Sequence, residues 1–171
     1  MDFIIETERM YLRQLVQTDF NDLCEMLQDI EVMYAWEHAF SDEQVLEWLN
    51  RQSERYEDSG VGYWAAIEKE SGKMVGQIGL TWSEIDNVKV LEPGYILKKA
   101  YWHKGFALEG TKACVDYAFI KMNIKKVHIS IRPENIASLK VAEKLGASIQ
   151  GKHYVHYNGK DMLHLVYTIE R

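Results

Sequence analysis

A basic turn that leads from an apolar strand into a helix is the feature that most limits how this chain can fold. The turn lies within Tyr101–Gly110, after a β-rich run at 88–97 and at the start of a helical pattern. The first backbone N–H groups of a helix have no partner inside it and carry partial positive charge, so a turn that exposes them can bind an anion. The sequence therefore predicts a phosphate-type anion site built from backbone.

The bulk composition indicates one compact domain, residues 1–171. Of the 171 residues 47% are hydrophobic and 27% charged, which is enough for a sizeable core but not for a second full domain. Asp2, Glu6 and Glu8 stand where a targeting peptide would be basic, and no apolar run approaches the roughly 18 residues of a membrane-spanning helix. We therefore expect a cytoplasmic protein with no membrane partner.

Charge is divided unevenly along the chain. Residues 1–70 carry 17 acidic and 5 basic side chains, a balance of −12, and residues 71–171 carry 9 acidic and 15 basic ones, a balance of +6. An acidic chain whose aromatic residues are not interleaved with its lysines fits nucleic acid poorly. The division favours a small polyphosphate bound by the second half and a cationic partner near the first, although a solvated basic face would carry the same lysines.

Two helices are expected in the first third of the chain. Apolar residues recur at spacings of three and four across 20–30, and Thr18 precedes them as a cap. Ser41, with the glutamine three residues later, has the spacing of a capping box, and the helix that it opens runs until Gly60. The aromatic loop between these helices, at 34–40, is either a plug over the core or one wall of an acceptor pocket.

Period-two patterns predict most of the strands. They lie at about 3–15 with a bend, and at about 63–67, 74–80, 88–97, 126–131, 147–157 and 160–169. Pro93 and Gly94 argue for a bulge or a parting of neighbouring strands, because proline cannot donate to a ladder and glycine weakens one. Asn158-Gly159 predicts a tight hairpin, and Asn135 is expected to cap a helix that ends at Gly146.

Three segments, taken in order, resemble a known family. They are Glu92–Leu97, Tyr101–Ala107 and Asn135–Ala147. Together they resemble the GNAT superfamily of acyl-CoA-dependent N-acetyltransferases, and within it the branch of ribosomal-protein N-terminal acetyltransferases. The resemblance implies an α+β (mixed α/β) fold: a central mixed, mostly antiparallel sheet of about seven strands, splayed where 88–97 meets 127–131 and flanked by about four helices.

The resemblance also implies that acetyl-CoA is the co-substrate and lies in the splayed cleft. Its pantetheine arm would pair with strand backbone and with Asn135, its thioester would lie near Ser138, and its pyrophosphate would accept N–H groups of the turn. The dipole of the following helix would add roughly 0.3–1 kcal/mol. The expected cofactor-binding residues are Ile96, Leu97, Lys98, His103, Lys104, Gly105, Phe106, Ala107, Leu108, Asn135, Ser138 and Lys144.

Two positions depart from the family pattern. His103 stands where a glycine is commonest, so its backbone lacks the freedom that glycine would give. The imidazole is either a tolerated loop side chain or a phosphate contact when protonated. Ala142 stands where many members carry a tyrosine that protonates the leaving sulfur, so that acid is absent here. Losing a general acid lowers the rate by about 10²- to 10⁴-fold at most.

Two residues are candidates for the chemistry of acetyl transfer. Glu92 is the candidate base, directly or through water, and its alternative interpretation is an exposed or salt-bridged strand carboxylate. Ser138 is a candidate aid at the sulfur, although a helical hydroxyl is more often a local hydrogen-bonder. A strand N–H near Ile96 or Leu97 would hold the oxyanion. An α-amine titrates at about 7.7–8.0 and a lysine near 10.4, so an N-terminal amine needs less help from a base.

These residues predict an N-acetyltransferase that moves an acetyl group directly from acetyl-CoA to a primary amine in a ternary complex. The amine would be the N-terminus of a protein or peptide, or a small cationic amine, recognised near Tyr34, Trp36 and Glu37. The alternative is a catalytically degenerate acyl-CoA-binding module or scaffold.

We expect no metal, because His153 and His156 point to opposite faces of a strand and have no plausible third ligand. Pairing of the last strand across a homodimer is left open.

Overall fold

The computed structural model describes residues 2–171, which form two sheets and four α-helices. All strand pairs in this part of the chain are antiparallel. The first sheet has the order β1 (Ile5–Glu6), β2 (Met10–Gln14), β3 (Tyr63–Glu68), β4 (Met74–Ile85), β5 (Val88–Leu97). The second has the order β6 (Lys126–Ile131), β8 (Lys160–Glu170), β7 (Ser148–Tyr157). The α+β class is confirmed, but the expected mixed sheet is not found, because the two sheets diverge instead of pairing.

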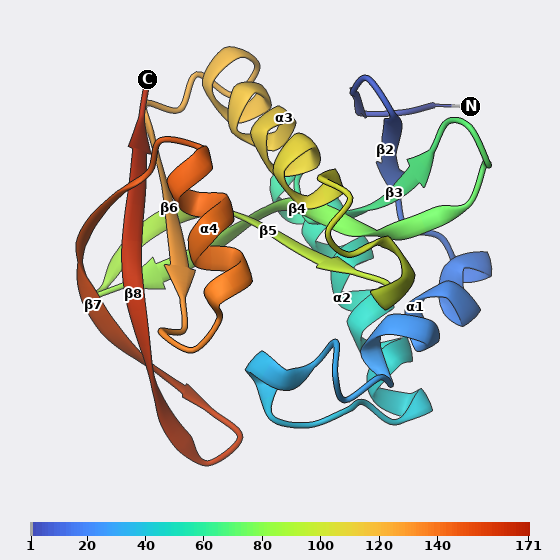
Figure 1. Ribbon diagram of the computed structural model, residues 1–171, viewed down its shortest axis with the longest axis horizontal. Helices are drawn as coiled ribbons and strands as arrows, with labels where there is room; N and C mark the ends of the chain where they lie inside the picture. The colour runs from blue at the N-terminus through green and yellow to red at the C-terminus, as the bar shows by residue number, and fades with distance from the viewer. Residues whose placement is uncertain (1) are drawn as a thin grey trace.

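The helices cover both faces of the first sheet. They are α1 (Phe20–Leu27), α2 (Asp42–Ser59), α3 (Phe106–Ile120) and α4 (Ile136–Lys144), with short 3-10 turns at Gln17–Asp19, Tyr34–Trp36 and Lys99–Tyr101. Alternate residues of β3 point to opposite faces: Trp64 packs in a cluster with residues of α3, and Ala65 packs in one with residues of α1 and α2. Figure 1 shows α3 and α4 side by side next to β6, with α1 beside α2.

Three local signals in the sequence are confirmed. The Ser41 hydroxyl accepts the N–H of Gln44 in a capping box, and the Asn135 side chain accepts an N–H of the first turn of α4. Asn158 and Gly159 both have positive φ, 50° and 75°, and join β7 to β8 in a tight turn. Each signal depends on backbone geometry within four residues, which is why it is legible in the sequence.

The expected places of Thr18 and Ile30 are wrong, and of the two alternatives at Pro93-Gly94 the bulge is not found. Thr18 lies inside the 3-10 turn before α1 rather than capping the helix, and Ile30 lies beyond the end of α1 and is 55% exposed. No bulge occurs at Pro93-Gly94, because the register of β4 and β5 is continuous through both residues. Proline is tolerated here since β5 is the edge of its sheet.

The expected parting of strands is confirmed, and it lies between β5 and β6, the facing edges of the two sheets. Glu92 of β5 bridges them: its Oε1 accepts the N–H of Ser130 on β6 at 2.9 Å, and its Oε2 accepts the hydroxyl of Ser83 on β4. Beyond this bridge the edge of β5 has no partner strand within residues 2–171. Gly94 is required beside it, because a Cβ there would overlap the Tyr63 hydroxyl.

Candidate active site

The turn before α3 presents an uninterrupted series of free backbone donors. Across the part of the chain that the structure describes, no N–H group from His103 to Leu108 donates a hydrogen bond within the protein, and the first that does is that of Glu109, to the Gly105 carbonyl at 3.1 Å. Gly105 caps the helix with φ 83°. Consecutive free donors at a helix N-terminus form a concave site for an anion.

The side chains of the turn leave this surface open. His103 adopts φ 59°, the left-handed conformation that a glycine would take, and its side chain is exposed. Lys104 is also exposed, with its Nζ 5.4 Å from the centre of the Tyr101 ring. Phe106 is 3% exposed and anchors the first turn of α3 in the core, while Ala107 adds little bulk. The accessible groups are therefore backbone donors and the exposed basic side chains of His103 and Lys104.

The free edge of β5 offers a second set of backbone groups. Lys98 donates its N–H to Val75 at 2.9 Å, so the alternating pattern of an antiparallel ladder turns the N–H of Ile96 toward β4 as well. The backbone groups of Tyr95 and Leu97 then face away from β4, and the Leu97 carbonyl is already taken by the Trp102 indole at 3.1 Å. The donors available at this edge are thus the N–H groups of Tyr95 and Leu97.

The backbone and the side chain of Lys98 both make contacts within the protein. Its carbonyl accepts the N–H of Tyr101 at 2.9 Å, and its Nζ contacts Asp22 at 2.5 Å and Glu25 at 2.6 Å on α1. Burial would lower the pKa of this lysine, but the two carboxylates outweigh burial and raise it. Both its backbone groups and its charge are therefore occupied inside the protein.

A hydrogen-bonded chain crosses the cleft from β5 to the aromatic loop. The hydroxyls of Tyr95 and Ser138 lie 3.0 Å apart, the Ser138 N–H donates to Asn135 Oδ1 at 3.2 Å, and the Tyr34 hydroxyl donates to the same oxygen at 2.5 Å. Burial raises the pKa of Tyr95, so its hydroxyl keeps its proton at neutral pH. These hydrogen bonds connect Ser138 and Asn135, which are expected to bind the cofactor, with Tyr34, which is expected to bind the acceptor.

Glu92 and Tyr95 lie on opposite faces of β5. Tyr95 packs with the cluster that contains α3, whereas Ile96 packs with α1 and α2. Because side chains alternate along a strand, Glu92 shares the face of Ile96. The free edge of β5 thus has the Glu92 carboxylate on one face and the Tyr95 hydroxyl on the other. Sequence analysis missed Tyr95, and its odd spacing from Glu92 was the signal that could have found it.

The aromatic loop lines a cavity of about 200 Å³ next to α4. Its walls are Tyr34, Ala35, Glu37, Arg132, Glu134 and Asn135. Trp36 is not part of this wall and instead packs against the cluster between α1 and α2. The loop therefore covers the core through Trp36 and lines a cavity through Tyr34, Ala35 and Glu37, and the binding of an acceptor in that cavity stays a prediction.

Glu37 is not a free negative charge. It contacts Arg132 at 3.4 Å and Lys160 at 2.9 Å, and the hydrogen bond from Lys160, together with the nearby guanidinium, lowers its pKa. His38 stacks on Tyr157 and Lys160 pairs with Glu37, so the loop is attached at two points to the β7–β8 hairpin, which lies to its left in Figure 1. Glu37 thus joins the aromatic loop to Arg132 and to Lys160 of the hairpin.

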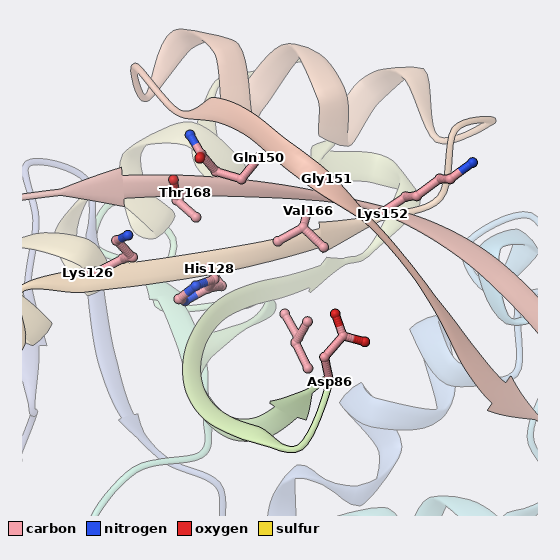
Figure 2. A pocket seen from close by; sticks show the side chains of 9 residues that line it. Asp86, Lys126, His128, Gln150, Gly151, Lys152, Val166 and Thr168 are labelled. Atoms are coloured by element: carbon pink, nitrogen blue, oxygen red, sulfur yellow. The ribbon is translucent and has the colours of Figure 1, made fainter.

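A second cavity, of about 210 Å³, lies on the outer face of the three-stranded sheet (Figure 2). It is bounded by the β4–β5 turn, with Asp86, and by side chains of β6, β7 and β8, including His128 and Lys152. None of the residues expected from the sequence to bind cofactor or amine lines it. The free edge of β5 and the aromatic loop are instead connected through α4, by the hydrogen bonds of Tyr95 with Ser138 and of Tyr34 with Asn135.

Residues 9–148 match the acetyltransferase (GNAT) domain family. The chain belongs to the GNAT acetyltransferase family. Members of this family use acetyl-CoA, and the free donors of the turn and of β5 fit its diphosphate and its amide-bearing arm.

Individual proteins are similar to this GNAT acetyltransferase over most of its length. The uncharacterized protein YkkB of Bacillus subtilis (strain 168) is 35% identical over 141 residues, which are 82% of each chain. The uncharacterized N-acetyltransferase p20 of Bacillus licheniformis is 29% identical over 147 residues, 85% of this chain and 82% of that one. The solved structure of RimL, a ribosomal L7/L12 alpha-N-protein acetyltransferase in complex with coenzyme A, has a TM-score of 0.80 at 15% identity, covering 99% of this chain and 98% of that one, and so shares the fold.

Two further residues of this acetyltransferase can now be placed. Ala142, at the position where the resemblance implies a tyrosine in many members, is 1% exposed on α4, and an alanine offers no hydroxyl. Lys144 is exposed in the last turn of the same helix. Within residues 2–171 no helix combines the length and the apolar character needed to span a membrane.

Part of the charge difference between the two parts of the chain is used in ion pairs inside the molecule. Ion pairs join residues 1–70 to residues 71–171 at Arg9–Glu109, Lys98–Asp22, Lys98–Glu25, Lys99–Glu31, Arg132–Glu37 and Lys160–Glu37. Acidic side chains on α1 and in the aromatic loop therefore already have cationic partners. Charge balance along the sequence is thus a weaker guide to the acceptor than it first appears to be.

Proposed function

We propose that this protein transfers the acetyl group of acetyl-CoA directly to a primary amine, in a ternary complex and without an acyl-enzyme intermediate. The observation that carries the proposal is the free edge of β5, with donors at Tyr95 and Leu97, next to six consecutive free donors at the start of α3. Strand-like pairing suits the amides of pantetheine, and the turn suits a diphosphate. The two sets lie in the order in which those groups occur along coenzyme A.

The chemistry needs an oxyanion donor and two proton transfers. The amine nitrogen attacks the thioester carbon, the resulting oxyanion accepts the N–H of Leu97 or Tyr95, and the carbon–sulfur bond then breaks. The proton lost by the amine goes to Glu92, directly or through water. The departing thiolate takes its proton from the Ser138–Tyr95 hydroxyl pair or from solvent, since Ala142 offers none. A thiol titrates near 8.5, so the thiolate leaves tolerably at neutral pH.

Glu92 keeps capacity for this role despite its two hydrogen bonds. An ionised carboxylate accepts up to about four hydrogen bonds, and Ser83 and Ser130 use two. These bonds also fix the carboxylate at the point where the sheets part, on the face opposite Tyr95. A fixed carboxylate next to the free edge suits a base that acts through a bound water.

The acceptor that we propose is the N-terminal α-amine of a protein or peptide, or a small cationic amine. The cavity beside Tyr34 is lined by the carboxylates of Glu37 and Glu134, which offer acceptors to an ammonium group although Arg132 and Lys160 balance their charge. The RimL structure supports the first alternative, because that protein is named for α-N-acetylation of a ribosomal protein.

An acetylation screen tests the proposal. The purified protein is incubated with acetyl-CoA and panels of peptides, polyamines and aminoglycoside-type amines, and CoA release is measured together with the mass of the product. We expect release that depends on the amine and a product heavier by one acetyl group. Release no greater than that of a boiled control, across all panels, would remove the proposed activity.

Glu92→Gln separates catalysis from binding. The amide keeps the oxygen that accepts Ser130 N–H, so the strands stay joined while the base is lost. We expect turnover to fall by about 10²- to 10⁴-fold with unchanged affinity for CoA. Glu84→Gln, an exposed carboxylate on β4 of the same hairpin, is the matched control and should keep full turnover. Unchanged turnover in Glu92→Gln would exclude Glu92 as the base.

A degenerate acyl-CoA-binding module or scaffold is the second candidate. The buried Ala142 favours it, because the family's tyrosine is missing from the face of α4. This candidate predicts that CoA binds to the wild-type protein while no amine in the screen is acetylated. Binding measured by calorimetry and turnover measured by thiol release therefore distinguish the two.

A further inference from the structure

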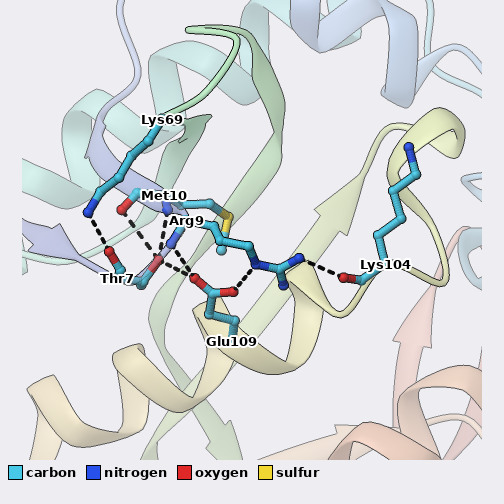
Figure 3. Close-up of polar contacts among 6 residues, drawn as sticks. All are labelled: Thr7, Arg9, Met10, Lys69, Lys104 and Glu109. Atoms are coloured by element: carbon cyan, nitrogen blue, oxygen red, sulfur yellow. Dashed lines mark hydrogen bonds and ion pairs between the residues drawn. The ribbon is translucent and has the colours of Figure 1, made fainter.

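Arg9, just before β2, contacts the turn and α3 from a position about 100 residues away in the sequence. Its Nε donates to Glu109 Oε2 at 2.6 Å and its Nη1 donates to the Lys104 carbonyl at 2.9 Å (Figure 3). Its guanidinium also lies 4.4 Å from the centre of the Phe106 ring. The Arg9 side chain thus contacts the loop before α3 at Lys104, and the first turn of α3 at Phe106 and Glu109.

The bond to Lys104 fixes the direction of one backbone donor. In a trans peptide the carbonyl and the following N–H point in opposite directions. Because the Lys104 carbonyl is directed at Arg9, the Gly105 N–H is directed away from it, toward the open side of the turn. Gly105 also leaves room for the guanidinium, since a Cβ there would lie 3.3 Å from Arg9 Nη2.

Glu109 would otherwise oppose an anion at this site. It lies in the first turn of α3, beside the free donors, and a carboxylate there repels a diphosphate. Burial would raise the pKa of Glu109, but hydrogen bonds from Thr7, from the Arg9 N–H and from the Arg9 side chain outweigh burial and lower it. Thr7 Oγ1 donates at 2.6 Å and Arg9 N at 2.8 Å. Glu109 is therefore ionised, and Arg9 is the cation that neutralises it.

We propose that Arg9 is a positioning residue of the cofactor site: it orients the turn through the Lys104 carbonyl and cancels the charge of Glu109, so that the free N–H groups can bind the diphosphate of coenzyme A. This inference rests on the proposed function. It adds the segment around Thr7 and Arg9 to a site that the sequence placed only at 96–108 and 135–144.

The test measures CoA affinity by isothermal titration calorimetry for the wild type, Arg9→Met and Arg9→Lys. Losing charge-assisted hydrogen bonds that hold the turn should raise the Kd for CoA by about 10- to 100-fold in Arg9→Met. Arg9→Lys keeps the charge but lacks the fork that reaches both partners, so its Kd should fall between those of the wild type and Arg9→Met. Thermal unfolding confirms that each variant is folded, and Arg9→Lys carries the test if Arg9→Met is not.

A fragment without the diphosphate separates positioning from a general loss of structure. Pantetheine binding, followed by saturation-transfer NMR, should be the same in the wild type and in Arg9→Met, because pantetheine does not reach the turn. Lys112→Met removes one positive charge from the exposed side of α3, where Lys112 pairs with Asp116, and should leave the Kd for CoA unchanged. This control accounts for the long-range effect of charge.

Glu109→Gln in the Arg9→Met background tests the neutralisation. Removing the carboxylate that Arg9 no longer balances should restore CoA affinity by about 3- to 10-fold. No recovery would overturn neutralisation, and an unchanged Kd in Arg9→Met would overturn the role of Arg9 as a whole. If the wild type itself does not bind CoA, the proposed function fails, and that outcome is distinct from a failure of the Arg9 proposal.

Discussion

At the scale of single residues, His103 in the turn before α3 adopts a backbone conformation that is unfavourable for a residue with a Cβ. His103 occupies the left-handed region at φ 59° although it carries a Cβ, while its neighbour Gly105 occupies the same region without strain. A non-glycine residue there is destabilised by about 1–2 kcal/mol. The sequence identified His103 as the irregular position of the motif, and the structure gives the reason in its dihedral angle.

His103→Gly should stabilise the protein. Relief of the left-handed strain exceeds the extra entropy that glycine gives the unfolded chain, so we expect a gain of about 0.5–1 kcal/mol in the free energy of unfolding and a rise of about 2 °C in Tm. Gly105→Ala, at φ 83°, should change both quantities in the opposite direction. CoA affinity should not change in His103→Gly, and a weaker affinity would instead indicate that the imidazole contacts phosphate.

At the scale of elements, the three-stranded sheet β6–β8–β7 contains two histidines that are held in their neutral form. Burial lowers the pKa of His128, and burial together with the nearby His153 and Arg132 lowers the pKa of His164. His128 lies on β6 and His164 lies on β8. Protonation of His128 and His164 therefore destabilises the folded protein.

Stability should fall as the pH is lowered from 7.5 to 5.5. The unfolded histidines take up protons below their ordinary pKa of about 6.5, whereas the folded ones resist, so the unfolded state binds more protons in this range. The depressed pKa values of Glu37 and Glu109 act at lower pH, below the ordinary carboxylate range, and do not contribute here. Thermal unfolding at each pH should show a smaller loss of Tm in a His128→Gln, His164→Gln double variant. An equal loss would contradict the assignment.

At the scale of the whole molecule, ion pairs between the acidic first part of the chain and the basic remainder hold helices and loops against the sheets. The pair of Lys98 with Asp22 and Glu25 attaches α1 to the end of β5, and the pair of Lys160 with Glu37 attaches the β7–β8 hairpin to the aromatic loop. The Lys98 side chain is only 11% exposed, whereas that of its neighbour Lys99 is 55% exposed. We therefore expect Lys98 to contribute more than Lys99 to the free energy of unfolding.

Lys98→Met should destabilise the protein by about 1–2 kcal/mol, because it leaves two carboxylates close together with no cation between them. Lys99→Met removes an exposed pair with Glu31 and should change the free energy of unfolding by no more than about 0.5 kcal/mol. Urea unfolding of both variants checks the difference. Equal midpoints for the two would mean that burial of Lys98 adds nothing to its ion pairs.

The sequence by itself determined the features that depend on a few neighbouring residues. The capping box at Ser41, the cap at Asn135, the turn at Asn158-Gly159 and the exposed donors after Lys104 all follow from local backbone chemistry. The family motifs, read in order, also gave the α+β class and the parting of β5 from β6. Pro93 was recognised as incompatible with a central ladder, although the edge position of β5, and not a bulge, accommodates it.

Only the tertiary structure decided which distant side chains meet. Arg9 with Glu109, Tyr34 with Asn135, and Glu37 with Lys160 are each separated by about 100 residues or more. Such contacts depend on strand register and on how helices pack across both faces of a sheet, and neither leaves a periodic signal in the sequence. For the same reason a charge balance of −12 in the first 70 residues suggested an external cation, although Asp22, Glu25, Glu31 and Glu37 pair with cations of the same chain.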